Sequence, residues 1–278
     1  MGPLEAHRAY FAELITANVG QPEGRLTAAF ASTCRERFTG PGPWKVVGET
    51  GYIETSSDDP AFLYQNVAVA LLPEKRINNG EPALHAACLA SLNIQEGETV
   101  IHVGAGSGYY TALLAKLTGS AGRVIAYEIE SELVQRATAN LTDLQNVTIH
   151  LRSGAEAPLP SCDAIYVNAG ATAPLDIWLD SLRSGGRLLF PLTDDSGAGG
   201  MLLVTKVLLR HFNARFVCPV LFIPCFGARD TRTAKKLSEA FGRGDFRRVQ
   251  SLRRDSFPDG SCWCSGNGWW LSTDISAS

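Results

Sequence analysis

The feature that most constrains this chain is the run from Val100 to Tyr110, where a β-branched apolar stretch leads directly into three glycines at alternate positions. Apolar residues at a helical period resume from Thr111, which predicts a buried strand, a tight turn and a helix. Such a turn needs backbone conformations that side chains forbid, and it offers free N–H groups and a helix N-terminus to a polar ligand. It therefore predicts a site for a nucleotide-type cofactor, although a glycine-rich turn needed only for packing would have a similar sequence.

A second short apolar strand, residues 123–127, ends at Glu128. In folds of this kind, a carboxylate at the tip of the second strand binds the two ribose hydroxyls of the cofactor. The alternative is a solvated residue that opens the next helix, because Glu130 and Glu132 follow closely. The order of strand, glycine turn, helix, strand and acid favours ribose binding.

The glycine spacing also bears on which cofactor is bound. A dinucleotide fingerprint has the pattern G-x-G-x-x-G, and here the bulky Tyr109 occupies the position of its third glycine. The turn G-A-G-S-G instead suits a cofactor without a pyrophosphate, for which S-adenosyl-L-methionine is the candidate. The predicted cofactor-binding residues are Val103, Gly104, Ala105, Gly106, Ser107, Gly108, Glu128, Ile129, Gly154, Ala155 and Asn168.

Strands and helices alternate through the middle of the chain. The expected strands are 100–103, 124–127, 147–151, 164–167 and 187–191, and the expected helices between them are 109–117, 131–141 and 173–182. This alternation predicts an α/β fold with a doubly wound, mostly parallel sheet. The turns at Gly154 and Asn168 follow strands, at the edge where open α/β sheets bind ligands, although short turns without a ligand would look similar.

The residues before this core are predicted to form a helical N-terminal cap. Apolar faces indicate helices over 7–19 and 25–38, whereas 44–72 is less regular and ends in a strand or an extended arm over 67–72. The polar stretch 73–82 then leads into a helix that begins at Pro82. This stretch is either a surface connection or a substrate-binding loop.

The predicted substrate-binding residues lie in this loop and the first turn of the helix: Asn78, Asn79, Gly80, Glu81, Pro82 and His85. The two asparagines and Glu81 suit a peptide backbone. His85 is either a base for a weakly acidic acceptor or a packed core residue on a helix with Leu84 and Leu89.

The C-terminal part of the chain differs from the core. Residues 201–209 and 216–223 resemble a closing antiparallel pair, and from residue 231 the sequence becomes rich in arginine and tryptophan. Five arginines cluster here: Arg243, Arg247, Arg248, Arg253 and Arg254. They form either a site for an acidic partner or a solvated helix face. We therefore divide the chain into a cap with the substrate loop (1–92), a cofactor-binding core (93–230) and an extension (231–278).

Composition excludes several classes of protein. A net charge of -3 gives no basic footprint for nucleic acid, and no apolar run approaches the length of a membrane span. The first residues lack the apolar region of a signal peptide, so we expect a soluble, cytoplasmic protein. The seven scattered cysteines favour reduced, mostly buried thiols, and the pair Cys262 and Cys264 lacks a second pair of ligands for a metal. The sequence does not indicate an oligomeric state.

Residues 92–191 resemble the catalytic domain of the protein-L-isoaspartate O-methyltransferases, a class I S-adenosylmethionine-dependent family. The resemblance rests on four segments: 103–111, 122–128, 162–171 and 182–191. It implies the class I methyltransferase fold, S-adenosyl-L-methionine as cofactor and a protein or peptide as substrate. The expected reaction is methylation of a carboxylate, of isoaspartyl type.

The chain departs from the pattern of this family at three places. His102 stands where the family usually has an acid, and Ser153 where it has an aspartate. The substrate loop of the family is roughly G-Q-T-I-S-x-P, so Gly80 stands where that pattern has a hydroxyl-bearing serine. We expect these changes to affect the binding of the isoaspartyl substrate more than the binding of the cofactor.

A carboxylate acceptor has a pKa of about 4, so it is ionised at neutral pH and needs no strong general base. Catalysis then comes from holding acceptor, methyl and sulfur in line with water excluded, and we predict no catalytic side chain. The alternatives are a methyltransferase of the same fold with a different acceptor, a nicotinamide-dependent oxidoreductase, against which Tyr109 counts, and a non-catalytic peptide-binding module that retains the cofactor.

Overall fold

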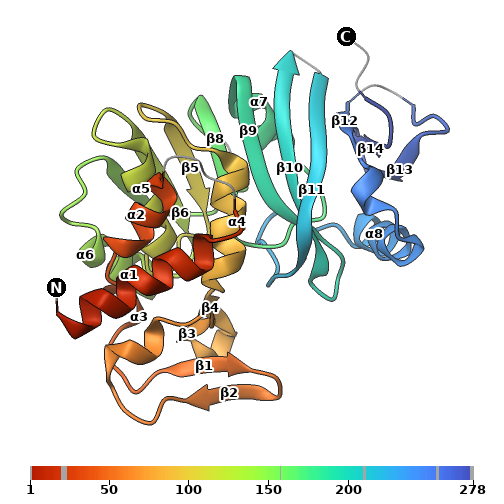
Figure 1. The fold of residues 1–278 in the computed structure, drawn as a ribbon. Helices are drawn as coiled ribbons and strands as arrows, with labels where there is room; N and C mark the ends of the chain where they lie inside the picture. The colour runs from red at the N-terminus through yellow and green to blue at the C-terminus, as the bar shows by residue number, and fades with distance from the viewer. Residues whose placement is uncertain (1, 20–23, 157, 209–210, 255–256, 276–278) are drawn as a thin grey trace. The chain divides into compact units, whose positions relative to one another are not determined.

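The computed structural model describes residues 2–19, 24–156, 158–208, 211–254 and 257–275 (Figure 1). The chain divides into two compact units, the first made of Met1–Glu98 and Ala105–Leu151, the second of Thr99–Gly104 and Arg152–Ser278. The division falls inside the glycine turn, between two consecutive residues. The boundaries expected at 92/93 and 230/231 follow the sequence pattern and stay predictions.

The first unit begins with three helices, α1 (Pro3–Thr16), α2 (Arg25–Ala31) and α3 (Glu36–Thr39). The continuous helix predicted over 25–38 is therefore wrong, because it is interrupted between α2 and α3. The hydroxyls of Ser32 and Thr33 donate to main-chain carbonyls one turn earlier, each at 2.7 Å, and such bonds compete with helix propagation.

Arg35, the residue before α3, is fully buried. Its guanidinium donates to the main-chain carbonyls of Leu63, Gln65 and Val67. This side chain therefore ties the break between the helices to the segment 63–67, which includes the end of the 3-10 helix η1 (Pro60–Leu63).

A four-stranded antiparallel sheet follows, in the order β2-β1-β3-β4 (Figure 1). Its strands are β1 (Lys45–Gly48), β2 (Gly51–Glu54), β3 (Val69–Leu72) and β4 (Ile77–Asn79), with the 3-10 helix η2 (Pro73–Lys75) between the last two. The expected cap is thus not purely helical, and part of the expected loop is a strand. Strands of three or four residues are too short to show a period of two in the sequence.

The rest of the first unit carries elements of the α/β core. These are α4 (Pro82–Leu92), α5 (Tyr109–Thr118), β6 (Arg123–Glu128), α6 (Ser131–Asn140) and β7 (Val147–Leu151). Strands β6 and β7 run parallel, in register from Val124↔Val147 to Glu128↔Leu151. The predicted starts of all three helices are confirmed.

The second unit contains eight strands in the order β13-β14-β12-β11-β10-β9-β8-β5. Strands β5 (Thr99–Val103), β8 (Cys162–Val167) and β9 (Leu182–Thr193) are parallel, and α7 (Asp176–Ser181) connects the last two. From β9 onward the pairing is antiparallel, first to β10 (Ala198–Leu208) and then to β11 (His211–Leu221). The predicted closing pair is confirmed, except that Leu209 lies outside the described residues.

The C-terminal extension folds as part of the same unit. It contains α8 (Thr231–Arg243), the 3-10 helix η3 (Phe246–Arg248), β12 (Ser251–Arg253), β13 (Cys262–Ser265) and β14 (Trp270–Ser272). Strand β12 pairs with β11, and aromatic rings from β11, α8, η3 and β13 pack edge to face. No helix in the described ranges is long and apolar enough to cross a membrane.

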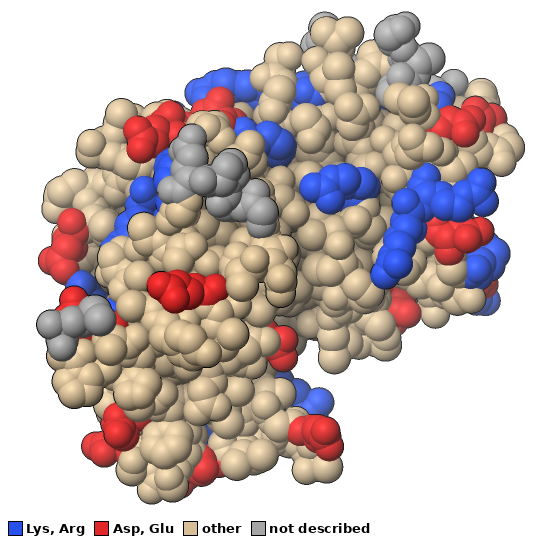
Figure 2. Space-filling model, viewed as in Figure 1, with Lys and Arg blue, Asp and Glu red and all other residues tan. Residues whose placement is uncertain are grey.

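Figure 2 shows lysine and arginine side chains gathered where Figure 1 places β11 and α8. Several of the clustered arginines are held by groups of the chain itself. Arg243 donates to the carbonyl of Trp263 at 2.8 Å, and the guanidinium of Arg253 lies 5.1 Å from the centre of the Trp270 ring. Arg254 pairs with two aspartates of α7. These three side chains therefore have structural partners within the chain.

Candidate functional site

The glycine turn between β5 and α5 has a left-handed backbone at Gly104, Gly106 and Gly108, whose φ angles are +77°, +57° and +96°. L side chains rarely adopt such angles. At Gly108 there is also no space, since a Cβ would lie 2.7 Å from Cδ1 of Leu141. The three glycine positions of the turn are therefore bare backbone, as the sequence predicts.

Two residues between these glycines fix the turn in the first unit. The N–H of Ala105 donates to the carbonyl of Tyr127 in β6 at 3.2 Å. Ser107 is buried, its carbonyl accepts from the Asn140 amide at 2.9 Å, and its hydroxyl has no partner within the described ranges. A buried hydroxyl without a partner is a group that a ligand can satisfy.

Glu128 lies at the C-terminal end of β6 and is nearly buried. Its Oε2 accepts from the N–H of Gly106 at 2.8 Å, and its Oε1 accepts from the N–H groups of Ile129 and Glu130 at 2.8 and 3.1 Å. The carboxylate is thus attached to the glycine turn, whereas Glu130 is the N-cap of α6. This geometry favours the interpretation of Glu128 as a site residue over a solvated helix start.

The predicted substrate residues lie around the start of α4, in the same unit. Asn78 and Asn79 are in β4, Glu81 is the N-cap of α4 and Pro82 is its first residue. Asn78 accepts from the Tyr52 hydroxyl at 2.8 Å. Asn79 is 6% exposed, and its amide nitrogen has no partner in the part of the chain that the structure describes.

Gly80 and His85 are in direct contact. The imidazole of His85 is buried and stacks on the Tyr110 ring, with 3.6 Å between the ring centres, and the Tyr110 hydroxyl donates to the Gly80 carbonyl at 2.9 Å. A Cβ at Gly80 would overlap Nε2 of His85. The imidazole therefore occupies the space next to the loop that a serine side chain would need. Tyr110 was not predicted from the sequence as part of this cluster.

In the second unit, Asn168 follows β8 and continues its pairing with β5. Its N–H donates to the carbonyl of Val103 at 2.8 Å, and its side-chain nitrogen lies 2.8 Å from Nε2 of His102. The side-chain oxygen of Asn168 is buried without a partner among the residues described. Burial lowers the pKa of His102 to about 3, so this ring is neutral and accepts the amide proton.

His102 makes the folded state sensitive to acid. The unfolded ring titrates near 6.5, so between pH 6.5 and 3 the unfolded chain binds a proton that the folded chain does not. The contribution of His102 to the free energy of unfolding is therefore fully present well above pH 6.5. It decreases as the pH falls, and about 2 kcal/mol is lost at pH 5. Thermal unfolding at pH 7.5 and 5.0 measures this loss, which His102→Phe should reduce and substitution of the exposed His7 should not. An unchanged pH dependence in His102→Phe would contradict the assignment.

The turn after β7 packs directly against the end of β5. A Cβ at Gly154 would lie 2.5 Å from Cγ2 of Val103, so this position requires glycine. Nε1 of the buried Trp178 donates to the Gly154 carbonyl at 2.8 Å. The hydroxyl of Ser153 accepts from the N–H of Ala155 at 3.1 Å, which closes the turn. Trp178 was not predicted as a site residue, because in the sequence it looks like any apolar residue on a helix face.

The cysteines show no arrangement for a metal. None of the seven is in a disulfide, and no group of three or more metal-ligating side chains occurs in the described ranges. Burial raises the pKa of Cys264 to about 11 and that of Cys162 to about 12, which keeps both protonated at neutral pH.

Comparison with known proteins agrees with this arrangement. The sequence profile of the family "Protein-L-isoaspartate(D-aspartate) O-methyltransferase (PCMT)" matches residues 52–230. The chain is 29% identical to a protein-L-isoaspartate O-methyltransferase of Brucella anthropi, over 75% of this chain and 88% of that protein. It is also 29% identical to protein-L-isoaspartate O-methyltransferase 2 of an Anaeromyxobacter species, over 79% of this chain and 83% of that protein.

Solved structures show the fold. One protein-L-isoaspartate O-methyltransferase aligns with a TM-score of 0.66 at 20% identity, over 85% of this chain and 68% of the other. A second, from Plasmodium falciparum and in complex with S-adenosyl-L-homocysteine, aligns with a TM-score of 0.63 at 20% identity, over 79% of this chain and 98% of the other. The predicted class I methyltransferase fold and the predicted resemblance are both confirmed. The chain belongs to the protein-L-isoaspartate(D-aspartate) O-methyltransferase family.

Proposed function

We propose that this chain transfers a methyl group from S-adenosyl-L-methionine to the carboxylate of an isoaspartyl residue in a protein or peptide. The observation that carries the proposal is the attachment of the Glu128 carboxylate to the N–H of Gly106. Each carboxylate oxygen can accept about two hydrogen bonds, so Oε2 keeps an acceptor position for a ribose hydroxyl. Family membership supports the same reaction.

The residues present fit this cofactor. The glycine turn is bare backbone that a ligand can approach closely, and Ser107 and Asn168 each have a buried oxygen without a partner among the described residues. We assign cofactor contacts to the predicted set: Val103, Gly104, Ala105, Gly106, Ser107, Gly108, Glu128, Ile129, Gly154, Ala155 and Asn168. When bound, the cofactor supplies an electrophilic methyl group on a sulfonium.

The chain itself binds and orients the acceptor. A carboxylate with a pKa of about 4 is already the nucleophile at neutral pH, so no side chain has to remove a proton. We assign substrate contacts to Asn78, Asn79, Gly80, Glu81, Pro82 and His85. The buried amide nitrogen of Asn79 is suited to donate to a peptide oxygen. Orientation and exclusion of water then account for catalysis.

Radiolabelled methyl incorporation tests the proposal. The wild-type chain should label an isoaspartyl peptide with a base-labile methyl ester and leave the matched aspartyl peptide unlabelled. Calorimetry with S-adenosyl-L-homocysteine is run in parallel. Binding of S-adenosyl-L-homocysteine without any labelling would contradict the proposed substrate alone. Absence of binding would contradict the proposed cofactor as well.

The contact between Gly80 and His85 favours a second candidate, a methyltransferase of the same fold with a different acceptor. The loop lacks the hydroxyl of the family pattern, and an imidazole lies beside it. An imidazole can accept a proton from a weakly acidic acceptor, which a carboxylate does not require. A methylated peptide product that resists base, formed in place of the ester, would support this reading.

Gly80→Ala should destabilise the chain by about 1–3 kcal/mol, because the new Cβ overlaps His85 and the ring is held by its stack on Tyr110. The variant Gly80→Ala/His85→Ala should be less destabilised than the sum of its two single changes. Thermal unfolding of the four proteins measures this coupling. Gly242→Ala is the control, since no atom lies near its Cβ position; additive effects would contradict the contact.

We propose that the protein substrate is the partner, that nucleic acid and membrane surfaces are not bound, and that the chain acts in the cytoplasm. The seven cysteines, none of which is in a disulfide, support a reducing compartment.

A further inference from the structure

The C-terminal extension, residues 231–278, lies outside the family match yet is built into the second unit. In Figure 1 it is the blue end of the chain. Strand β12 continues the sheet beyond β11, with Phe212↔Leu252 in register, and the apolar face of α8 is buried. Two polar connections join this extension to the segments that carry Asn168 and Gly154.

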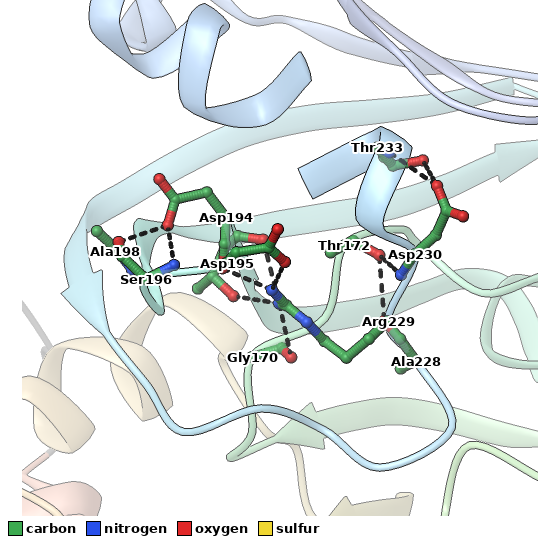
Figure 3. A network of polar contacts seen from close by, with 11 residues as sticks. Gly170, Thr172, Asp194, Asp195, Ser196, Ala198, Ala228, Arg229, Asp230 and Thr233 are labelled. Carbon is green, nitrogen blue, oxygen red and sulfur yellow. Dashed lines mark hydrogen bonds and ion pairs between the residues drawn. The ribbon is translucent and has the colours of Figure 1, made fainter. Parts of the chain in front are cut away.

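The first connection lies at the start of α8 (Figure 3). Asp230 caps the helix, because its Oδ1 accepts from the N–H and the hydroxyl of Thr233 at 2.7 and 2.6 Å. The N–H of Asp230 donates to the hydroxyl of Thr172 at 2.8 Å. Thr172 is four residues beyond Asn168, so the extension begins at a fixed point of the segment after β8.

Arg229 reinforces the same point. Its guanidinium donates to the carbonyl of Gly170 at 3.2 Å, to the hydroxyl of Thr193 at 2.8 Å and to the carbonyl of Asp194 at 2.6 Å (Figure 3). One side chain thereby joins the segment after β8 to the end of β9.

The second connection comes from Arg254, just after β12. Its guanidinium bonds to Asp176 at 2.7 Å and to Asp180 at 2.5 Å, on successive turns of α7. Helix α7 has six residues, too few to be stable alone, and its two aspartates repel each other when unpaired. Arg254 therefore stabilises both the helix and its position.

Helix α7 in turn carries Trp178, which is fully buried and donates to the carbonyl of Gly154. The Gly154 turn has no freedom to shift toward β5, because Val103 lies against it. A displacement of α7 would therefore move the Gly154 carbonyl or break its hydrogen bond.

We propose that Arg254 is a positioning residue for the cofactor site, acting through α7 and Trp178 on the Gly154 turn. The inference rests on the proposed function, since Gly154 and Ala155 are cofactor residues only there. The extension then serves the binding of S-adenosyl-L-methionine without touching it.

The test compares full-length variants in binding and kinetics. Arg254→Ala should raise the Kd for S-adenosyl-L-homocysteine and the KM for S-adenosyl-L-methionine about tenfold. The KM for the isoaspartyl peptide should stay within about twofold of the wild-type value. General destabilisation would not raise the KM for one substrate and spare the other. Arg254→Lys should be intermediate, because lysine cannot make the two-pronged contact. Arg248→Ala is the matched control, because Arg248 is an exposed arginine of the same extension that pairs with the nearby Asp245.

Asp176→Asn/Asp180→Asn removes the other side of the same contact and keeps the inference testable if Arg254→Ala does not fold. This double variant should raise the same Kd, and adding Arg254→Ala to it should cause little further loss. The inference would be overturned if folded Arg254→Ala had the same Kd as Arg248→Ala. It would also be overturned if the KM values for S-adenosyl-L-methionine and for the peptide rose equally. If the wild-type chain did not bind S-adenosyl-L-homocysteine, the proposed function itself would be contradicted.

Discussion

Replacing Glu128 with alanine should abolish measurable binding of S-adenosyl-L-homocysteine. A hydrogen bond to a charged group contributes about 1.5–3 kcal/mol, so the loss of the ribose contact to Oε2 alone weakens binding about 10-fold to 150-fold. The variant also releases the N–H of Gly106, whose bond to the carboxylate fixes the glycine turn. Calorimetric titration of purified protein measures the effect.

Two further variants separate charge from structure. Glu128→Gln keeps the shape of the side chain and one acceptor oxygen, so it should bind more weakly than wild type and better than alanine. Glu132→Gln changes an exposed carboxylate in the first turn of α6 and should leave the Kd unchanged. Wild-type affinity in folded Glu128→Ala would remove this residue from the cofactor site.

Arg35→Met should lower the free energy of unfolding by about 3 kcal/mol. The change leaves the buried carbonyl of Leu63 and the part-buried carbonyls of Gln65 and Val67 without their donors, and an unsatisfied group costs about 1–3 kcal/mol when buried and less where water reaches it. An apolar side chain cannot compensate, because the partners are main-chain groups that stay polar. The expected decrease in Tm is about 6–12 °C, measured by circular dichroism.

Arg37→Met is the matched control for this effect. Arg37 is two residues away, its side chain is 41% exposed, and it pairs with Asp143 on the surface at 2.7 Å. An exposed pair contributes at most about 1 kcal/mol, so the control should change the Tm by a few degrees at most. Equal losses in the two variants would contradict the structural role of Arg35.

The α/β core was predictable because its signals are local. The strand, glycine turn and helix around Gly106 require residue types that few other structures tolerate, and the acid at Glu128 follows at the spacing that the βαβ unit dictates. Helix starts such as Pro82 were predictable because proline suits the first turn. The attachment of Glu128 to the Gly106 N–H follows from the same topology.

What the sequence did not indicate depends on contacts between distant segments. The sheet β1–β4 consists of strands too short for a visible period, and the break between α2 and α3 depends on Arg35 reaching carbonyls about thirty residues away. The exclusion of any side chain at Gly80 arises from His85 across a turn. Likewise, the contact of Trp178 with Gly154 joins residues 24 apart, and no local pattern encodes it.

The strands added beyond β11 also bear on association between chains. A long strand edge with unpaired N–H and C=O groups is a template for aggregation, and β11 would present such an edge if the chain ended there. Strand β12 covers it from His211 to Asn213, and farther along, Pro219 lacks an N–H to offer. The outermost strand, β13, has four residues and a register shift between Cys262 and Cys264. Residues outside the family match thus cover this part of the β11 edge and leave a short strand as the outermost one.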